Sequence, residues 1–155
     1  MKAALVEFFK IVAVRFKRRY DICMGQEYRR TPTSVSLINY HFVFCPRYRR
    51  KALVGDVDKR FREILQDICN KNDFIIVALE VMPDHVHLFL NTLPSISPSD
   101  IMAKVKGATS RLLRQEFKHL RHLPSLWTRS FFCSTAGNVS SETITRYIEE
   151  QKKRG

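Results

Sequence analysis

The chain has 155 residues, of which 45% are hydrophobic and 27% are charged, and its formal net charge is +12. These values fit one ordinary globular domain and exclude an intrinsically disordered chain. No stretch of the sequence is long and apolar enough to predict a membrane-spanning helix.

The excess of positive charge is distributed along the whole sequence. Residues 1–30 carry eight basic and three acidic side chains, and residues 31–155 carry nineteen basic and twelve acidic ones. Such a field favours polyanions, with nucleic acid and an anionic membrane surface as the default candidates. A basic surface that only prevents aggregation is the alternative, but an excess not confined to one tail favours nucleic acid.

We expect the chain to have two parts. Residues 1–30 are interpreted as a basic extension, helical or flexible, in which Glu7 and Lys10 interrupt the apolar run that a signal peptide would need. Residues 31–155 are expected to form the functional domain, although Met24 is an alternative start of the functional chain. The four cysteines are too far apart in the sequence for a zinc knuckle or a redox pair, so we expect reduced thiols in a cytoplasmic protein.

The first half of this domain predicts a strand, a helix and a hairpin. β-Branched and aromatic residues predict a strand over residues 34–44. A helical period that begins with Asp56 as N-cap predicts a helix over 56–72. Residues 74–81 are apolar on both faces, which predicts a central strand, and a tight turn then leads into a second strand over 85–90.

The second half predicts a helix, a strand and a final helix. Ser97 followed by Pro98 and Asp100 is a helix start, with a capping side chain and a proline at the first helical position. This helix should direct four apolar side chains toward the core: Ile101, Val105, Ala108 and Leu112. A strand over 129–137 and a helix from Ser140 or Ser141 complete the chain.

The predicted order is strand, helix, strand, strand, helix, strand and an additional C-terminal helix. This order predicts an α+β fold of the ferredoxin-like (RRM-like) βαββαβ type, an antiparallel sheet with its helices on one face. Many RNA-binding domains share this arrangement, so the fold alone does not assign an activity.

His85 and His87 are the first candidate functional residues. Alternate side chains of a strand point to opposite faces, so these two imidazoles share one face while Val86, Leu88 and Leu90 occupy the other. Paired imidazoles can ligate one divalent cation but need a third ligand from elsewhere. Two structural histidines on a half-exposed face are the alternative interpretation.

Tyr147 and Gln151 are the second pair of candidates. They are four residues apart on the predicted final helix and therefore lie one turn apart on one face. A core-facing tyrosine with an amide near the helix end is the simpler interpretation. The functional one is a tyrosine nucleophile with a metal-binding neighbour, in which a metal-polarised phosphate compensates for the weak nucleophilicity of a phenol.

Several blocks of the sequence, taken together, resemble one family. "NYHFVFCPRYRRKALVGDV", "LEVMPDHVHLFL", "VKGATSRLLRQEF" and "LWTRSFFCSTAGNVSSETITRYIEEQ" occur in the order found in single-tyrosine HUH transposases of the insertion sequence 200/605 family. The resemblance covers about residues 34–151. The His-x-His element alone is a weak motif, and the order of the blocks is what makes the assignment specific.

The resemblance implies a site and a reaction. It implies that His85, His87 and Gln151 bind a divalent metal, Mg²⁺ or Mn²⁺, and that Tyr147 attacks single-stranded DNA to form a 5′-phosphotyrosine and a free 3′-hydroxyl. It also implies recognition of DNA hairpins at the element ends, and a homodimer with composite active sites. Asp84 is expected in a turn or supporting role and not as a ligand.

Basic residues supply the candidate DNA contacts: Arg47, Arg49, Arg50, Lys51, Lys104, Lys106 and Arg111. Any one of them could instead belong to a solvated face, and Tyr48 among the arginines could stack on an unpaired base or simply pack. Two other functions stay open. One is a domesticated HUH nuclease that processes repeated palindromes, or a replication-initiator nickase. The other is a non-enzymatic ferredoxin-like RNA-binding protein. It would need solvent-facing aromatic residues on the central strands, for which Phe89, on the histidine face, is the only obvious candidate.

Overall fold

The computed structural model describes residues 20–23 and 26–135, within a chain that divides into two compact units, residues 1–37 and 38–155. In the first unit, strands β1 (Tyr20–Cys23), β2 (Gln26–Thr31) and β3 (Ser34–Ser36) form an antiparallel sheet in that order. The first two strands differ from the expectation for residues 1–30, for which the sequence predicts a helical or flexible extension.

The strand predicted over residues 34–44 is divided between the two units. Ser34–Ser36 pairs with β2, whereas β4 (Ile38–Phe44) pairs with β6 (His85–Thr92) in a different sheet. The prediction of one continuous strand was therefore wrong. The same run of β-prone residues serves two pairing partners, and sequence propensity does not reveal where the partner changes.

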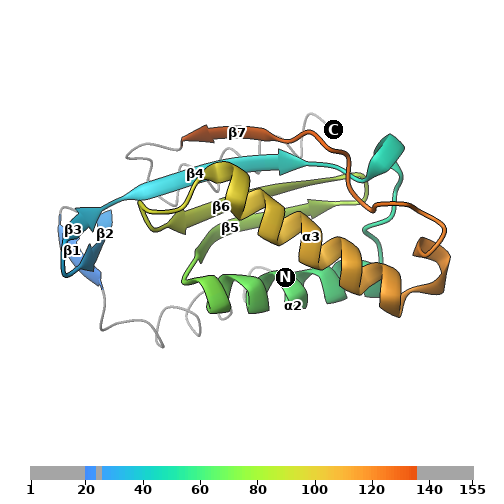
Figure 1. Ribbon diagram of the computed structural model, residues 1–155, viewed down its shortest axis with the longest axis horizontal. Coiled ribbons are helices and arrows are strands. Elements are labelled where there is room, and N and C mark those ends of the chain that lie inside the picture. The colour runs from blue at the N-terminus through green and yellow to red at the C-terminus, as the bar shows by residue number, and fades with distance from the viewer. Residues whose placement is uncertain (1–19, 24–25, 136–155) are drawn as a thin grey trace. The chain divides into compact units, whose positions relative to one another are not determined.

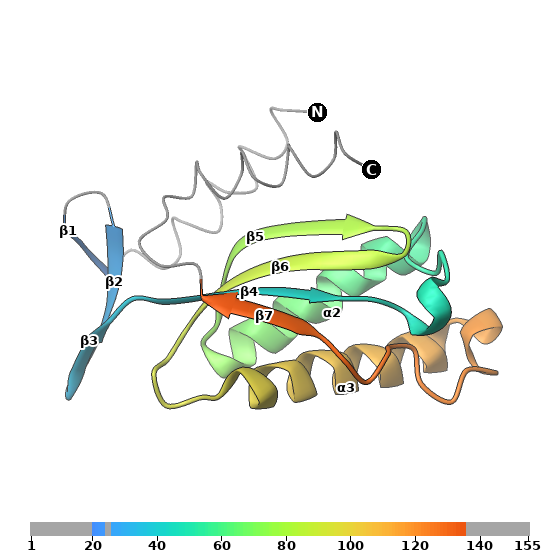
Figure 2. The same ribbon diagram turned by 90° about the horizontal axis from the view of Figure 1, so that it is seen from above.

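The second unit contains a four-stranded antiparallel sheet in the order β5-β6-β4-β7, where β5 is Ile75–Met82 and β7 is Phe132–Thr135. Helices α2 (Asp56–Asn72) and α3 (Pro98–Glu116) pack on one face of this sheet (Figures 1 and 2). This is the predicted ferredoxin-like arrangement. The short 3₁₀ turns η1 (Arg47–Arg49) and η2 (Lys118–Leu120) lie in the connections after β4 and α3.

Strand β5 is an edge strand among the described residues, since only β6 pairs with it there. We predicted a central strand because residues 74–81 are apolar on both faces. The structure shows instead a half-buried strand with a register shift between Ile76 and Ala78. The following turn has two residues, Pro83 and Asp84, because Met82 pairs directly with His85.

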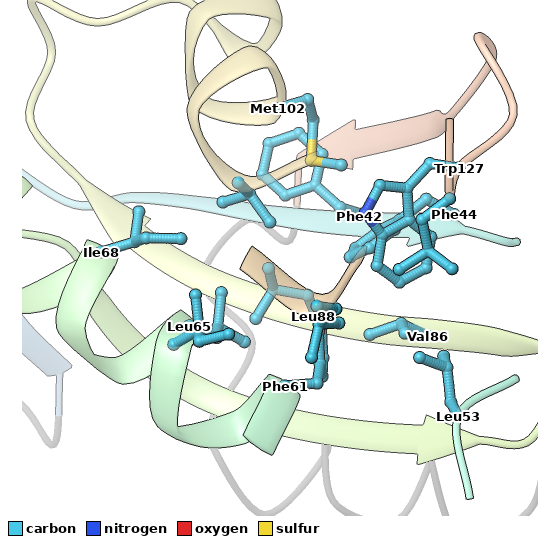
Figure 3. Packing of buried hydrophobic residues seen from close by; sticks show 14 of the residues in the cluster. Phe42, Phe44, Leu53, Phe61, Leu65, Ile68, Val86, Leu88, Met102 and Trp127 are labelled. Carbon is cyan, nitrogen blue, oxygen red and sulfur yellow. The ribbon is translucent and has the colours of Figure 1, made fainter. Parts of the chain in front are cut away.

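The core lies between the sheet and the two helices (Figure 3). Phe42, Leu88 and Phe61 are fully buried, and Trp127 lies edge-on to Phe44 at a ring-centroid distance of 4.9 Å. The indole N–H of Trp127 donates to Thr109 Oγ1 at 2.9 Å, which satisfies the polar group of this buried ring. These contacts anchor the segment after α3 to the helix.

The helix starts agree only in part with the prediction. Ser97 caps α3 as predicted and accepts from the Asp100 N–H at 3.1 Å. By contrast, Asp56 lies in the first turn of α2, and Gly55, with a φ of 57°, is the N-cap. On α3, Leu113 is fully buried, while the predicted core residue Leu112 is only partly buried. Within the described part of the chain, no helix combines the length and apolar character needed to cross a membrane.

Replacing the capping side chain should destabilise α3 specifically. We expect Ser97→Ala to lower the free energy of unfolding by about 0.5–2 kcal/mol, because the Asp100 N–H loses its acceptor. Ser99→Ala, an exposed serine in the same helical turn, is the matched control and should change it by less than about 0.5 kcal/mol. Urea denaturation followed by circular dichroism measures both, and equal losses would show that the cap is not the cause.

Candidate active site and basic groove

His85 and His87 lie on the sheet face opposite the helices. Their strand neighbours Val86 and Leu88 are fully buried in the core, whereas both histidines are half-buried. The two imidazole rings are 5.2 Å apart, centroid to centroid. The structure thus brings the two predicted metal ligands together on one surface, at the end of β6 that follows the hairpin turn.

Asp84 holds the first of these histidines. His85 Nδ1 lies 2.7 Å from Asp84 Oδ1, and Arg49 donates from a guanidinium nitrogen to Asp84 Oδ2 at 2.9 Å. The hydrogen bond to His85, helped by Arg49, lowers the pKa of the Asp84 carboxyl. A carboxylate with this low pKa is ionised at neutral pH and can only accept hydrogen bonds.

His41 is a site residue that the sequence analysis missed. Its Nε2 lies 3.1 Å from Nδ1 of His87, and its ring stacks on Phe89 at 4.1 Å with the two planes nearly parallel. Burial, and next the nearby His87, lower the pKa of His41 to about 4, so this ring is neutral at physiological pH. A signal was present, because aromatic side chains at every second position of "NYHFVF" place His41 on the face away from the core.

Burial also lowers the pKa of His87, and the charge of His85 acts in the same direction, while Glu80 opposes it from the neighbouring strand. Phe89 is only 4% exposed. It therefore packs under the histidine cluster and is not the exposed base-stacking residue that an RRM-type RNA-binding function would need.

The other two predicted site residues lie outside the described residues. Tyr147 and Gln151 belong to the segment after Thr135, as does the predicted final helix. Among the residues described, no group of three or more histidine, cysteine or acidic side chains is arranged to hold a metal ion. The histidine pair is therefore a partial donor set that needs at least one further ligand.

A second feature is a basic groove of about 1360 Å³ between α3 and the segments around it. Among the described residues no acidic side chain lines it, and its cationic residues there are Arg47, Lys106, Arg111, Arg114, Arg121 and Arg129. Three of these were predicted as DNA contacts. The other three were missed, although Arg114 follows Arg111 at the helical spacing that places both on one face.

Four predicted contacts do not line this groove: Arg49, Arg50, Lys51 and Lys104. Arg49 is paired with Asp84, and Arg50 donates to Nε2 of His122 at 3.0 Å. Arg49 and Arg50 are close to Arg47 in the sequence, but the backbone of η1 directs their side chains away from the groove.

Tyr48 lies at the groove and is 77% exposed. Its φ of 59° is in the left-handed region, and the guanidinium carbons of Arg47 and Arg50 lie 5.7 and 5.8 Å from the centre of its ring. The interpretation that Tyr48 simply packs is wrong. The structure holds its ring in solvent, close to two cations.

Comparison with known proteins identifies the family. The family model for the IS200-like transposase matches residues 34–151. The chain belongs to the IS200-like transposase family. This membership assigns the chain an enzymatic role in DNA processing.

Relatives and solved structures agree with the assignment. The IS200-like transposase chain is 34% identical to the ISDra2 transposase TnpA of Deinococcus radiodurans over 117 residues, which are 74% of this chain and 84% of that protein. It is 32% identical over 115 residues to the transposase for insertion sequence element IS200 of Salmonella typhimurium, covering 72% of this chain and 75% of that one.

Two solved structures have a similar fold. One is a protein of Deinococcus radiodurans R1 assigned as a transposase, with a TM-score of 0.66 and 35% identity over 79% of this chain and 97% of that chain. The other is the REP-associated tyrosine transposase bound to a REP hairpin, with a TM-score of 0.54 and 20% identity. It covers 81% of this chain and 67% of that one, and at this identity it supports the fold alone.

Lys106 and Lys104 of this IS200-like transposase should differ in their contribution to stability. Lys106 donates from Nζ to the carbonyl oxygens of Arg129 and Ser130 at 3.1 and 3.2 Å, whereas Lys104 is exposed on the same helix. We expect Lys106→Met to lower the free energy of unfolding by about 1–3 kcal/mol, and Lys104→Met by less than about 0.5 kcal/mol. Thermal and urea denaturation compare them. Equal stability of the two variants would mean that Lys106 does not tie the segment before β7 to α3.

Proposed function

We propose that this protein cleaves and rejoins single-stranded DNA at insertion-sequence ends through a 5′-phosphotyrosine intermediate. The observation that carries the proposal is the pair His85 and His87, which lie side by side on the face of β6 opposite the helices. Family membership supplies the context, and the resemblance of the C-terminal segment supplies the nucleophile, Tyr147.

The reaction balances without an external energy source. The phenolic oxygen of Tyr147 attacks the phosphorus of a phosphodiester, and the bond from phosphorus to the 3′-oxygen breaks. The 5′-phosphate stays on the tyrosine, and the leaving strand keeps a 3′-hydroxyl. Attack of a 3′-hydroxyl on the phosphotyrosine re-forms a phosphodiester and returns the phenol, so the covalent link conserves the bond energy.

A divalent cation, Mg²⁺ or Mn²⁺, fits the donors proposed for it. His85 and His87 would each offer one ring nitrogen, and Gln151 would add its amide oxygen. Such a mixed nitrogen and oxygen set accommodates a divalent ion, whose role when bound is to polarise the phosphate. Asp84 and His41 would hold the two imidazoles in place on the sheet face opposite the helices.

The basic groove is proposed as the binding surface for the DNA hairpin. The six cations that line the groove provide the field that attracts phosphates, and Tyr48 offers an exposed ring for one unpaired base. One structural neighbour, the REP-associated tyrosine transposase, was solved with a REP hairpin bound. The resemblance to the insertion sequence 200/605 family is the ground on which we extend hairpin recognition to this chain as its proposed substrate class.

We also propose a homodimer with composite active sites, in which Tyr147 of one subunit meets the histidines of the other. The resemblance to the insertion sequence 200/605 family supports it. A domesticated nuclease that processes palindromes is the second candidate, favoured by the fold of the REP-associated neighbour. The higher identity to insertion-sequence transposases, 34% and 32% against 20%, favours the first.

Loss of the phenol should abolish the covalent intermediate. With Mn²⁺ and a single-stranded oligonucleotide that carries an element-end hairpin, the wild-type protein should form an adduct that survives denaturing electrophoresis. Tyr147→Phe should form none, while Tyr40→Phe, at a partly buried tyrosine packed against the core, should form it normally. An adduct in Tyr147→Phe would remove this residue from the nucleophile role. Normal cleavage by His85→Ala or His87→Ala would refute the metal site.

Tyr48 should contribute to binding only where an unpaired base is available. In a Tyr147→Phe background, Tyr48→Ala should weaken binding to a hairpin with one unpaired base by about 1–3 kcal/mol, and Tyr48→Phe should leave it unchanged. Fluorescence anisotropy at fixed salt measures this, and a fully paired hairpin of equal length is the control. An equal loss on both hairpins would contradict the stacking role.

A further inference from the structure

Each of the two candidate metal ligands has its Nδ1 atom engaged by a neighbouring side chain. Asp84 Oδ1 lies 2.7 Å from Nδ1 of His85, and His41 Nε2 lies 3.1 Å from Nδ1 of His87. The two contacts are independent, since one comes from the hairpin turn and the other from β4. Both lie on the ring nitrogen that leaves Nε2 available.

The proton position at His85 follows from the acceptor. The carboxylate of Asp84 receives a hydrogen bond from Arg49 on its other oxygen and can only accept. Nδ1 of His85 must therefore carry a proton, and in the neutral ring the lone pair is on Nε2.

At His87 the geometry allows either imidazole to donate. We propose that His41 accepts from Nδ1–H of His87, so that His41 and Asp84 act as positioning residues that fix both histidines as Nδ1–H tautomers. Both Nε2 lone pairs are then ready for a divalent cation. The assignment agrees with the usual arrangement at metal sites, where a ligating histidine donates its other ring N–H to a neighbouring acceptor. It rests on the proposed function, which names His85 and His87 as the ligands.

The surroundings of His41 suit a fixed acceptor. The side chain is 7% exposed, and its ring lies 4.1 Å from Phe89 at an interplanar angle of 2°. β4 pairs His41 with Phe89 and Val43 with His87, so His41 reaches His87 diagonally across the two strands. Stacking and burial leave the ring little freedom to rotate away.

Asp84 is positioned by the hairpin turn and by Arg49. It occupies the second position of the two-residue turn between β5 and β6, next to the histidine that it holds. Arg49 approaches from the connection after β4 and fixes the carboxylate through its second oxygen. Without these partners the imidazoles could turn, or place a proton on Nε2, and the donor set would be disordered before the metal arrives.

The tautomers can be measured directly, in the absence of metal and DNA. Long-range ¹H–¹⁵N spectra of the full chain labelled at its five histidines, at pH 8, distinguish Nδ1–H from Nε2–H rings, and single variants assign the signals. We expect Nδ1–H tautomers for His85 and His87, and the same pattern with Mg²⁺ added. An Nε2–H ring at His87 would overturn the role of His41, and one at His85 would overturn that of Asp84.

Metal affinity gives a second readout that does not depend on activity. In a Tyr147→Phe background, Mn²⁺ binding followed by electron paramagnetic resonance should weaken roughly 10- to 100-fold in His41→Phe and Asp84→Ala. His41→Phe keeps an aromatic ring against Phe89. His41→Gln and Asp84→Asn keep an acceptor and should recover most of the affinity.

Two matched controls exclude a general effect. His119→Phe and Asp58→Ala change a histidine and an arginine-paired aspartate outside the cluster, and both should bind Mn²⁺ like the parent protein. Melting temperatures show that every variant is folded. Unchanged Mn²⁺ affinity in folded His41→Phe and Asp84→Ala would overturn the positioning role. If the parent binds no Mn²⁺ while both Nδ1–H tautomers are present, the metal-dependent function fails and the tautomer assignment stands.

Discussion

The antiparallel pairing of β4 with β6 is the constraint on which the rest of the second unit depends. Its register runs without interruption from Ile38 opposite Thr92 to Phe44 opposite Val86. Because side chains alternate, the same register directs Phe42 and Leu88 into the core and His41 and His87 onto the other face. A slip of one residue would exchange these faces completely. The buried aromatic and aliphatic side chains therefore fix the position of the imidazoles, and the geometry of the candidate site is set by the stability of the core beneath it.

Much of this arrangement could be predicted from the sequence, because its apolar residues follow the helical period in the helices and alternate in the strands. The helix over 56–72, the cap at Ser97 and the shared face of His85 and His87 all follow from local patterns. The features that were missed depend on which segments meet. His41 is an ordinary polar residue of a strand until β4 is paired with β6, and the edge position of β5 follows from strand order, which its apolar sequence does not encode. The groove could not be predicted from local patterns either. Arg121 and Arg129 lie beside Arg111 only because the segment after α3 folds back and buries Trp127.

The connection after β4 links the two candidate surfaces, the basic groove and the histidine face. Arg47 and Tyr48 line the basic groove, whereas Arg49, the next residue, pairs with Asp84 beside His85. Tyr48 and Arg49 have φ values of 59° and 49°, a conformation that costs non-glycine residues roughly 1–2 kcal/mol each. Such strain persists only where the surrounding structure over-determines it.

Here the surrounding structure does so through backbone contacts. The Arg47 N–H donates to the Leu126 carbonyl at 2.9 Å, the Thr128 N–H donates to the Cys45 carbonyl at 3.1 Å, and Pro46 forms a β-bridge with Trp127. The buried Trp127 thus fixes the backbone at Pro46 and Arg47. The next two side chains, Tyr48 and Arg49, then point to different surfaces. One strained turn presents an aromatic ring to the groove and, one residue later, a guanidinium to the carboxylate that lies 2.7 Å from Nδ1 of His85.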